Sequence, residues 1–253
     1  MINIILSGCS GQMGKAITEV AANDDNVCII CGFDKYTACD RGYPIYATPD
    51  EYDGPADVII DFSNPAALSP ILSYAKKRKL PAVIATTGLS SEQIAEIEDA
   101  SNEIAIFRSA NMSLGVNLMV ELVKKAASVL ASGFDIEIIE KHHNQKLDAP
   151  SGTALMLADA VNEALDSSLS YVYDRHSVRK KREKTELGIH SIRGGTIVGE
   201  HDVIFAGNDE IITLNHTALS KKVFAEGAVK AAQFIADAKP GIYDMKSVIN
   251  LER

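Results

Sequence analysis

Two adjacent histidines and a lysine are the residues of this sequence whose types and spacing best suit chemistry. His142 and His143 follow a predicted strand over residues 134–140, and Lys146 follows three positions later. Imidazole rings exchange protons near neutral pH, and the lysine ammonium carries a fixed positive charge with three hydrogen-bond donors. The trio can therefore donate a proton and hold an anion.

A predicted helix over residues 151–165 begins directly after this segment, behind an Asp-Ala-Pro loop. Its first residues are Ser151, Gly152 and Thr153. The first backbone N–H groups of a helix have no partner within the helix, so they suit a carboxylate or a phosphate. A proton donor, a cation and an anion cradle within such a short stretch indicate chemistry on a small acidic molecule.

Each feature alone also fits an ordinary structural role. A His-His pair often ends a strand with one ring in solvent, and a serine after a proline is a common helix start. A metal site is disfavoured, because neighbouring side chains on a strand point to opposite sides and no cysteine lies nearby. We therefore expect no metal.

A glycine-rich turn near the N-terminus is typical of a dinucleotide site. Residues 8–14 read GCSGQMG between a predicted strand and a predicted helix, and Asp34 ends the next strand 20 residues after Gly14. The glycines let the backbone approach a pyrophosphate, and the carboxylate suits the ribose hydroxyls. Lys35 would suit a 2′-phosphate. The candidate residues at the turn are Gly8, Cys9, Ser10, Gly11, Gln12 and Met13.

Two further segments follow predicted strands in the same half of the chain. They contain Ala85, Thr86 and Thr87, and Ser109, Ala110, Asn111 and Met112. Ligands of open parallel sheets bind at the carboxyl ends of the strands. Small residues there would let a nicotinamide and its ribose approach the backbone.

The elements that must position these residues differ between the two halves. The first half predicts strands over 2–7, 27–33, 57–62, 82–86 and 104–107, with helices near 13–22, 65–77 and 91–101. This alternation indicates a parallel sheet of the α/β class with helices on both faces. The second half predicts helices over 114–130, 151–165 and 220–238, and strands over 134–140, 188–192, 196–205 and 210–217. Short connections between its last strands indicate an antiparallel or mixed sheet. Residues 167–186, which include RKKREK, are interpreted as a mobile, solvated loop.

The composition excludes several function classes. The chain has 253 residues, 46% of them hydrophobic, and a net charge of −9, which argues against nucleic-acid binding. No apolar run approaches the roughly 18 residues of a membrane span, and MINIILSG is too short for a signal peptide. We expect a cytoplasmic protein without a membrane partner. The four cysteines are Cys9, Cys28, Cys31 and Cys39. Cys28 and Cys31 form a C-x-x-C on a predicted strand, and we interpret these two as small core residues rather than a redox or zinc site.

With both sites described, the sequence closely resembles the 4-hydroxy-tetrahydrodipicolinate reductases, also called dihydrodipicolinate reductases. The most specific string is EIIEKHHNQKLDAPSGTA at 137–154. The other matching strings are GCSGQMG at 8–14, ATTG at 85–88, SANMSLGVN at 109–117, IVGEHDVIFAG at 197–207 and GIYDM at 241–245. The resemblance spans essentially the whole chain.

The resemblance implies a fold and an assembly. Residues 1–113 and 223–253 would form a Rossmann-type dinucleotide-binding domain. Residues 114–222 would form a mixed α/β domain for substrate binding and tetramerisation. Hinges would lie near 112–114 and 221–223, and the protein would be a homotetramer.

The resemblance also implies residue roles. His142 corresponds to the catalytic proton donor, and Lys146 to the partner that binds substrate and helps supply the proton. His143 corresponds to a contact with a substrate carboxylate. Gly152 and Thr153 correspond to a main-chain carboxylate cradle that Ser151 adjoins. The glycine turn, Asp34 and the segments 85–87 and 109–112 correspond to cofactor contacts.

Three positions depart from the family pattern. Ala85 stands where glycine is common, and Met112 stands where phenylalanine is common. An arginine associated with a substrate carboxylate is here Lys221, which keeps the charge but loses bidentate geometry. Arg193 is an alternative cation.

The implied reaction is NADH- or NADPH-dependent reduction of 4-hydroxy-tetrahydrodipicolinate, a dicarboxylate, to tetrahydrodipicolinate in the diaminopimelate pathway of lysine biosynthesis. Two alternatives remain open. A semialdehyde dehydrogenase would need a catalytic cysteine in the second half, and the sequence has none there. A non-catalytic nucleotide-binding sensor would keep the glycine turn but has no need of His142 and Lys146.

Overall fold

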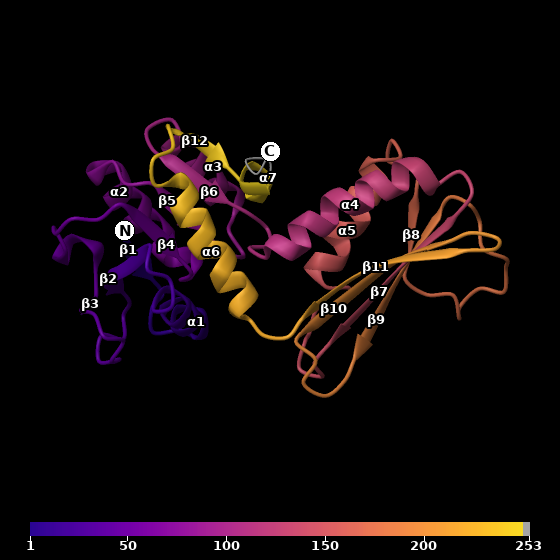
Figure 1. The fold of residues 1–253 in the computed structure, drawn as a ribbon, viewed down its shortest axis with the longest axis horizontal. Coiled ribbons are helices and arrows are strands. Elements are labelled where there is room, and N and C mark those ends of the chain that lie inside the picture. The colour runs from indigo at the N-terminus through magenta and orange to yellow at the C-terminus, as the bar shows by residue number, and fades with distance from the viewer. Residues whose placement is uncertain (250–253) are drawn as a thin grey trace. The chain divides into compact units, whose positions relative to one another are not determined.

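The chain folds into two compact units in a computed structural model that describes residues 1–249. The first unit contains Met1–Leu114 and the segment from Lys221 onward, and the second contains Gly115–Ser220. Figure 1 labels their helices and strands. The first unit is thus built from both ends of the chain and the second from its middle.

The first unit contains a seven-stranded sheet in the order β12-β6-β5-β4-β1-β2-β3, and every pair is parallel. The strands are β1 (Ile2–Ser7), β2 (Val27–Phe33), β3 (Ile45–Tyr46), β4 (Val58–Asp61), β5 (Ala82–Ile84), β6 (Ala105–Arg108) and β12 (Gly241–Tyr243). Most apolar residues of the five inner strands are buried, as in a parallel sheet covered on both faces.

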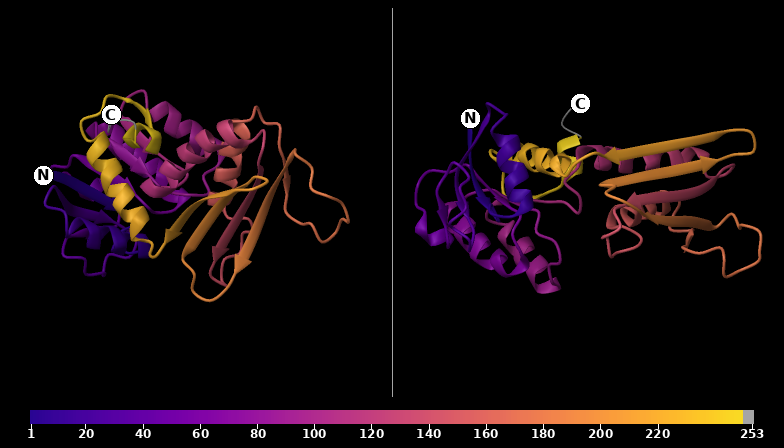
Figure 2. Two further views of the ribbon diagram at one scale, coloured as in Figure 1. Left: turned by 45° about the vertical axis from the view of Figure 1, so that its right-hand side comes forward. Right: turned by 90° about the horizontal axis from the view of Figure 1, so that it is seen from below.

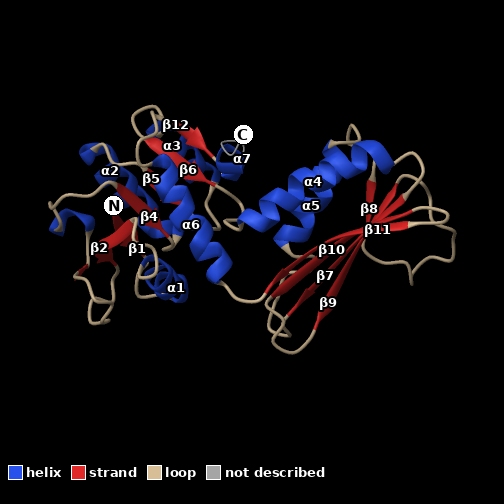
Figure 3. Ribbon diagram, in the orientation of Figure 1, coloured by secondary structure: helices blue, strands red, loops and turns tan. Residues whose placement is uncertain are grey.

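Helices cover both faces of this sheet. They are α1 (Gln12–Ala21), α2 (Leu68–Arg78), α3 (Ser91–Ala100), α6 (Lys222–Ile235) and α7 (Met245–Ile249), with single 3-10 turns at Pro49–Glu51 and Pro65–Ala67. Neighbouring residues of β1 enter different cores, because side chains alternate along a strand. Ile4 packs in the core that contains residues of α1 and α6, whereas Ile5 packs in the core that contains residues of α2 and α3. Figure 3 distinguishes these helices from the strands by colour.

The second unit contains a five-stranded sheet in the order β11-β10-β7-β9-β8. Its strands are β7 (Asp135–His142), β8 (Ser170–Val172), β9 (Glu186–Arg193), β10 (Gly199–Ala206) and β11 (Ile211–Ala218). β10 pairs antiparallel with β7 and β11, whereas β9 pairs parallel with β7 and β8, so the sheet is mixed.

Two helices, α4 (Leu114–Leu130) and α5 (Gly152–Glu163), lie along one side of the second sheet (Figures 1 and 2). β7 alternates strictly between buried and half-buried residues. Its buried set begins with Ile136 and Ile138, which pack against both helices, and continues with Glu140 and His142. The strand therefore carries two titratable side chains onto the same face as its apolar core residues.

The predicted fold class is confirmed. The elements missed by the sequence analysis are short: β3, β8, β12 and α7 have two to five residues, which is too few to show a period. None of the helices within residues 1–249 combines the length and apolarity needed to cross a membrane.

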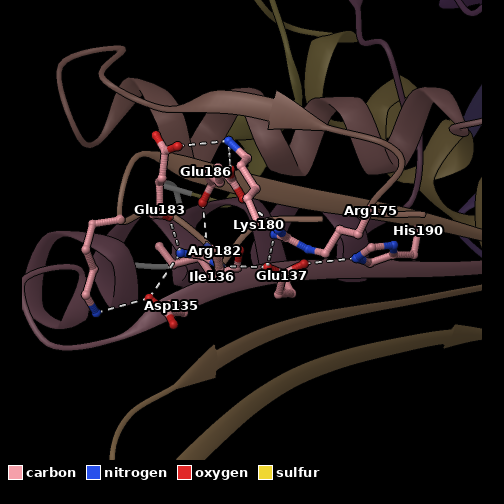
Figure 4. Close-up of polar contacts among 10 residues, drawn as sticks. Asp135, Ile136, Glu137, Arg175, Lys180, Arg182, Glu183, Glu186 and His190 are labelled. Atoms are coloured by element: carbon pink, nitrogen blue, oxygen red, sulfur yellow. Dashed lines mark hydrogen bonds and ion pairs between the residues drawn. The ribbon is translucent and has the colours of Figure 1, made fainter. Parts of the chain in front are cut away.

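Two expectations were wrong. Cys28 is exposed rather than a core residue, because it occupies the solvent-facing side of β2, whereas Cys9 and Cys31 are buried. Residues 167–186 are not simply a solvated loop, because they contain β8 and a network of ion pairs (Figure 4). Arg182 reaches the carboxylates of Glu137 and Asp135 at 2.8 and 3.0 Å, and its side chain is only 17% exposed.

Candidate active site

The glycine turn of the first unit joins β1 to α1. Gly8 has φ of +78°, and a Cβ there would lie 2.5 Å from the carbonyl oxygen of Phe62. A Cβ on Gly14 would overlap the backbone of Cys9. Only glycine satisfies both constraints. The N-cap of α1 is Gly11, so no side chain caps the first N–H groups of this helix. That is the backbone arrangement that suits a pyrophosphate.

A cavity of about 740 Å³ lies beside this turn. Gly8, Ser10 and Gly11 line it, together with Asp34 and Lys35. Its volume is that of an ordinary cofactor or ligand pocket. The structure therefore brings the predicted turn and the predicted ribose-binding residues to one hollow.

The carboxylate of Asp34 is held by the backbone. It accepts hydrogen bonds from the N–H groups of Ser10 and Tyr36, both at 3.0 Å. The ammonium of Lys35 lies 4.9 Å from the centre of the Tyr36 ring. Arg41, which the sequence analysis did not single out, donates to the carbonyl oxygens of Cys9 and Ser10, both at 3.1 Å. The carboxylate of Asp34 and the guanidinium of Arg41 thus both hold the backbone of the turn in place.

The remaining predicted cofactor residues do not line this cavity. They are Cys9, Gln12, Met13, Ala85, Thr86, Thr87, Ser109, Ala110, Asn111 and Met112. The segments 85–87 and 109–112 follow β5 and β6 at their carboxyl ends. Thr86 donates to the buried carboxylate of Asp61 at 2.6 Å, and the side chain of Met112 is buried in the core. Met112 would therefore meet a ligand through its backbone rather than its side chain.

In the second unit, the buried carboxylate of Glu140 is the centre of a polar cluster. Arg193 donates to both of its oxygens at 2.7 Å, and the backbone N–H of Ser151 donates at 3.1 Å. Nδ1 of His142 lies 2.6 Å from Oε2 of the same carboxylate. The register of β7 with β9 sets this arrangement, because it pairs His142 with Arg193.

These contacts keep Glu140 ionised. Burial raises the pKa of the Glu140 carboxyl, but hydrogen bonds from Arg193 and His142 outweigh burial and lower this pKa to about 2. An ionised carboxylate can only accept hydrogen bonds. Nδ1 of His142 must therefore donate, and Nε2 is left as the ring nitrogen that can exchange a proton.

His201 on β10 packs edge-on against His142, with ring centres 5.2 Å apart. Its Nε2 lies 3.0 Å from the hydroxyl of Ser151, which also caps α5 by accepting from the N–H of Ala154. Burial, followed by the charge of His142, lowers the pKa of His201 to about 4, so His201 is neutral at pH 7. Ser151, predicted to contact substrate, is itself buried, and these two contacts involve its hydroxyl.

The loop after β7 carries the other predicted residues. The N–H of Lys146 donates to the carbonyl of His143 at 3.1 Å, and its ammonium lies 2.9 Å from Asp148. Within residues 1–249, no hydrogen bond joins Lys146 to His142, although the charge of Lys146 contributes to the lowered pKa of His201. A Cβ on Gly152, at the start of α5, would meet no atom within 4 Å. No protein atom thus occupies the space that a side chain at position 152, in the proposed carboxylate cradle, would fill.

Glu140 and His201 belong to this cluster but were not predicted from the sequence. The predicted strand ended at residue 140 and left His142 in a loop, whereas β7 continues to His142. The available signal was the spacing of Glu140 and His142, since residues two apart on a strand share a face. Arg193, considered there as a substrate cation, pairs instead with Glu140.

Two family profiles cover nearly the whole chain. The profile of the dihydrodipicolinate reductase N-terminus matches residues 2–112, and that of its C-terminus matches residues 115–249. The chain belongs to the dihydrodipicolinate reductase family. The resemblance identified from the motifs is thereby confirmed.

Named relatives within this family are similar over their whole length. The 4-hydroxy-tetrahydrodipicolinate reductase of Caldanaerobacter subterraneus subsp. tengcongensis is 53% identical over 249 residues, which are 98% of each chain. That of Clostridium novyi is 50% identical over 98% of each chain. A solved structure of dipicolinate-bound dihydrodipicolinate reductase from Paenisporosarcina sp. TG-14 covers 96% of this chain and 97% of its own, with a TM-score of 0.81 and 22% identity. At that identity the structural match supports the fold.

Proposed function

We propose that this protein is an NADH- or NADPH-dependent oxidoreductase that reduces 4-hydroxy-tetrahydrodipicolinate to tetrahydrodipicolinate, in lysine biosynthesis through diaminopimelate. The observation that carries the proposal is that relatives named as this enzyme are 53% and 50% identical to the chain over nearly its whole length. The polar cluster around His142 supports it, because a sensor would need no buried group that prepares a proton donor.

The first unit would hold the dinucleotide. The fit rests on the glycine turn, whose Gly8 and Gly14 admit no side chain, and on the cavity beside it. Asp34 would accept hydrogen bonds from the ribose hydroxyls, and Lys35 lines the same hollow. The residues of segments 85–87 and 109–112 would adjoin the nicotinamide and its ribose. When bound, the reduced nicotinamide supplies the hydride.

The second unit would supply the proton. Hydride addition to the conjugated imine, formed by loss of the 4-hydroxyl, places an electron pair on the neighbouring carbon and ring nitrogen. Nε2 of His142 would donate the proton that this pair accepts. Lys146 would stabilise the developing negative charge. Glu140 holds the ring through Nδ1 throughout.

The substrate carboxylates would be bound by side chains and by backbone. His143 and Lys146 would contact one carboxylate, and the N–H groups of Gly152 and Thr153 would form the cradle for the other. Ser151 would support this cradle by capping α5 rather than by touching the ligand. Lys221, which lies 3.4 Å from the amide oxygen of Gln12, supplies a cation in place of the family arginine.

The same proposal includes the assembly and the location. The second sheet would form the contact of a homotetramer in the cytoplasm. No metal would take part, and residues 1–249 contain no group of three or more side chains suited to hold one. Light scattering after size-exclusion chromatography measures the assembly directly.

A spectrophotometric assay tests the activity. Freshly generated 4-hydroxy-tetrahydrodipicolinate is added to the protein with NADH or NADPH, and the loss of absorbance of the reduced nicotinamide is followed. We expect turnover that requires both substrate and protein. Cofactor binding without turnover would instead favour the nucleotide-binding sensor.

A further inference from the structure

We propose that Glu140 is a positioning residue that holds His142 in one tautomer, with the proton on Nδ1, and that Arg193 keeps Glu140 in its role as acceptor. The inference rests on the proposed function, which assigns the proton donation to His142. It adds the means by which the fold selects Nε2 as the donating atom.

The strand geometry gives Glu140 little freedom. Glu140 and His142 are two residues apart on β7, which lies between β10 and β9 in the sheet. Glu140 has no exposed surface, and its pairing with His201 on β10 and Ser191 on β9 fixes its backbone on both sides. The 2.6 Å contact to Nδ1 is therefore set by the sheet rather than by a mobile side chain.

Arg193 prevents Glu140 from becoming a proton acceptor. Its guanidinium donates to both carboxylate oxygens at 2.7 Å, which is the bidentate geometry of the strongest arginine–carboxylate pairs. The backbone N–H of Ser151, which is neutral, donates a further hydrogen bond to this carboxylate at 3.1 Å. A carboxylate stabilised in this way accepts the Nδ1 hydrogen bond but does not remove the Nδ1 proton. Every proton that leaves His142 must then leave from Nε2.

The groups that face the His142 ring agree with this division of roles. Glu140 is the anion in contact with Nδ1, Arg193 on β9 is the cation paired with that carboxylate, and His201 on β10 is a neutral ring packed against His142. Gly199 on β10 lies beside Nε2 and has no side chain to cover it. Glu140 thus holds the ring at Nδ1, and no side chain at position 199 covers Nε2.

The same strand provides a matched control on its opposite face. Glu137 is held by Arg175 and Arg182 at 3.0 and 2.8 Å, and it contacts Nε2 of His190 at 2.9 Å (Figure 4). It is thus also a carboxylate in contact with arginine and histidine, but it lies away from the proposed site. A merely structural effect of neutralising a carboxylate on β7 would appear in Glu137→Gln as well.

The first experiment reads the tautomer without any variant of Glu140. Two-bond ¹H–¹⁵N correlation spectra of the full protein with ¹⁵N-labelled histidine report which ring nitrogen carries the proton, and the signal absent from His142→Gln assigns His142. We expect the neutral ring to carry its proton on Nδ1. A proton on Nε2 in the neutral ring would overturn the inference, whatever the outcome of the activity assay.

The second experiment compares Glu140→Gln, Glu140→Asp and Glu137→Gln in the reductase assay. We expect Glu140→Gln to lower kcat by on the order of a hundredfold or more, as expected when a catalytic histidine loses its orienting carboxylate. The limb of the kcat profile that reports protonation of the donor should move to lower pH, because a neutral amide stabilises the imidazolium less than a carboxylate does. Glu140→Asp should recover part of kcat and restore the position of that limb. Glu137→Gln should keep kcat within about twofold of the wild type and should leave the limb at the same pH.

The outcomes separate the two proposals. An inactive wild-type protein would refute the proposed function but leave the tautomer measurement informative. An active wild-type protein whose Glu140→Gln variant keeps the same kcat and pH profile would refute the inference alone. If Glu140→Gln does not fold, the spectra of the wild type and the profile of Glu140→Asp still decide the question.

Discussion

A Cβ atom built on Gly199 would lie 3.1 Å from Nε2 of His142, across the contact between β10 and β7. This nitrogen is the one left free when Nδ1 donates to Glu140. Because position 199 is glycine, no side chain from this position crowds the proposed proton-donating atom. Its backbone does not require glycine, because its φ lies outside the left-handed region.

Gly199→Ala should lower kcat by about tenfold while the protein remains folded. The added methyl group would force the His142 ring to shift by a few tenths of an ångström, and small displacements of reacting groups cost rate steeply. The measurement is kcat together with the circular dichroism spectrum. Gly133→Ala is the matched control, because a Cβ there meets no atom within 4 Å, and it should retain wild-type kcat. Equal kcat in both variants would mean that a methyl group at position 199, beside Nε2 of His142, does not affect the reaction.

His142→Gln and Lys146→Ala should each lower kcat by roughly a hundredfold or more, since each removes a proton donor or a charge stabiliser. NAD(P)H affinity should hardly change, because both residues belong to the second unit. The double variant should lose much less than the product of the single losses, because the residues act together. Wild-type kcat in either single variant would contradict the assignment.

The fold was largely predictable because its long elements carry strong periodic patterns. The apolar runs of β1 and β2 and the amphipathic α4 were identified within the sequence, and the glycine turn fixed where β1 meets α1. The strands β3 and β12, with two and three residues, were missed because they join the sheet only through tertiary pairing. No local pattern marks such strands.

The residues proposed to face the ligands could be named as candidates from the sequence, but the groups behind them could not. The HHNQK segment and the Ser-Gly-Thr helix start have local signatures, whereas the contact of Arg193 with Glu140 joins residues 53 positions apart. That contact depends on the register of β9 beside β7, which the sequence alone does not give. The same reason explains why the charges of residues 175–186 were interpreted as solvated although Arg175 and Arg182 pair with Glu137 on β7.

Pyridine-2,6-dicarboxylate should inhibit competitively with the imine substrate. It carries two carboxylates at a separation like that of the substrate, but its aromatic ring has no bond ready for hydride. The cradle at Gly152 and Thr153 and the cations beside it motivate the prediction. Inhibition kinetics and calorimetry with cofactor present would measure it. Pyridine-3,5-dicarboxylate is the control compound, and equal inhibition by both would argue against a cradle of defined spacing.

Glu140→Gln should destabilise the protein most above pH 5 and progressively less as the pH falls toward 2. The carboxyl titrates at about 2 in the folded protein instead of its ordinary 4.5, so its stabilising effect is complete above the unfolded value and disappears as the pH passes through the folded value. This difference corresponds to roughly 3 kcal/mol at about 1.4 kcal/mol per pH unit. Chemical unfolding at several pH values would measure the effect. Glu121→Gln, on the exposed surface of α4, should show no such pH dependence. A penalty for Glu140→Gln that stays constant from pH 7 to 3 would contradict the proposed stabilisation.

The cofactor preference should be weak in the wild type and should shift in opposite directions when Asp34 and Lys35 are removed. Asp34 can accept from the ribose hydroxyls of NADH and would repel the 2′-phosphate of NADPH, but the N–H groups of Ser10 and Tyr36 already offset part of its charge. Lys35 lines the same cavity and can attract the phosphate. Lys35 is exposed and Asp34 is half-buried, and charges near the surface interact by only about 0–1 kcal/mol, so neither residue dominates. We expect a preference within about ten- to thirtyfold, at tenfold per roughly 1.4 kcal/mol.

The test is kcat/KM with NADH and with NADPH for the wild type, Asp34→Ala and Lys35→Ala. Asp34→Ala should favour NADPH, because it removes the repulsion, and Lys35→Ala should favour NADH, because it removes the attraction. Lys230→Ala, an exposed lysine of α6 that does not line the cavity, should leave the ratio unchanged and controls for a general loss of positive charge. A thousandfold preference in the wild type, or shifts opposite to these, would mean that other residues of the pocket determine the choice. Arg41 would then be the next residue to change, because its guanidinium already binds the backbone of the glycine turn.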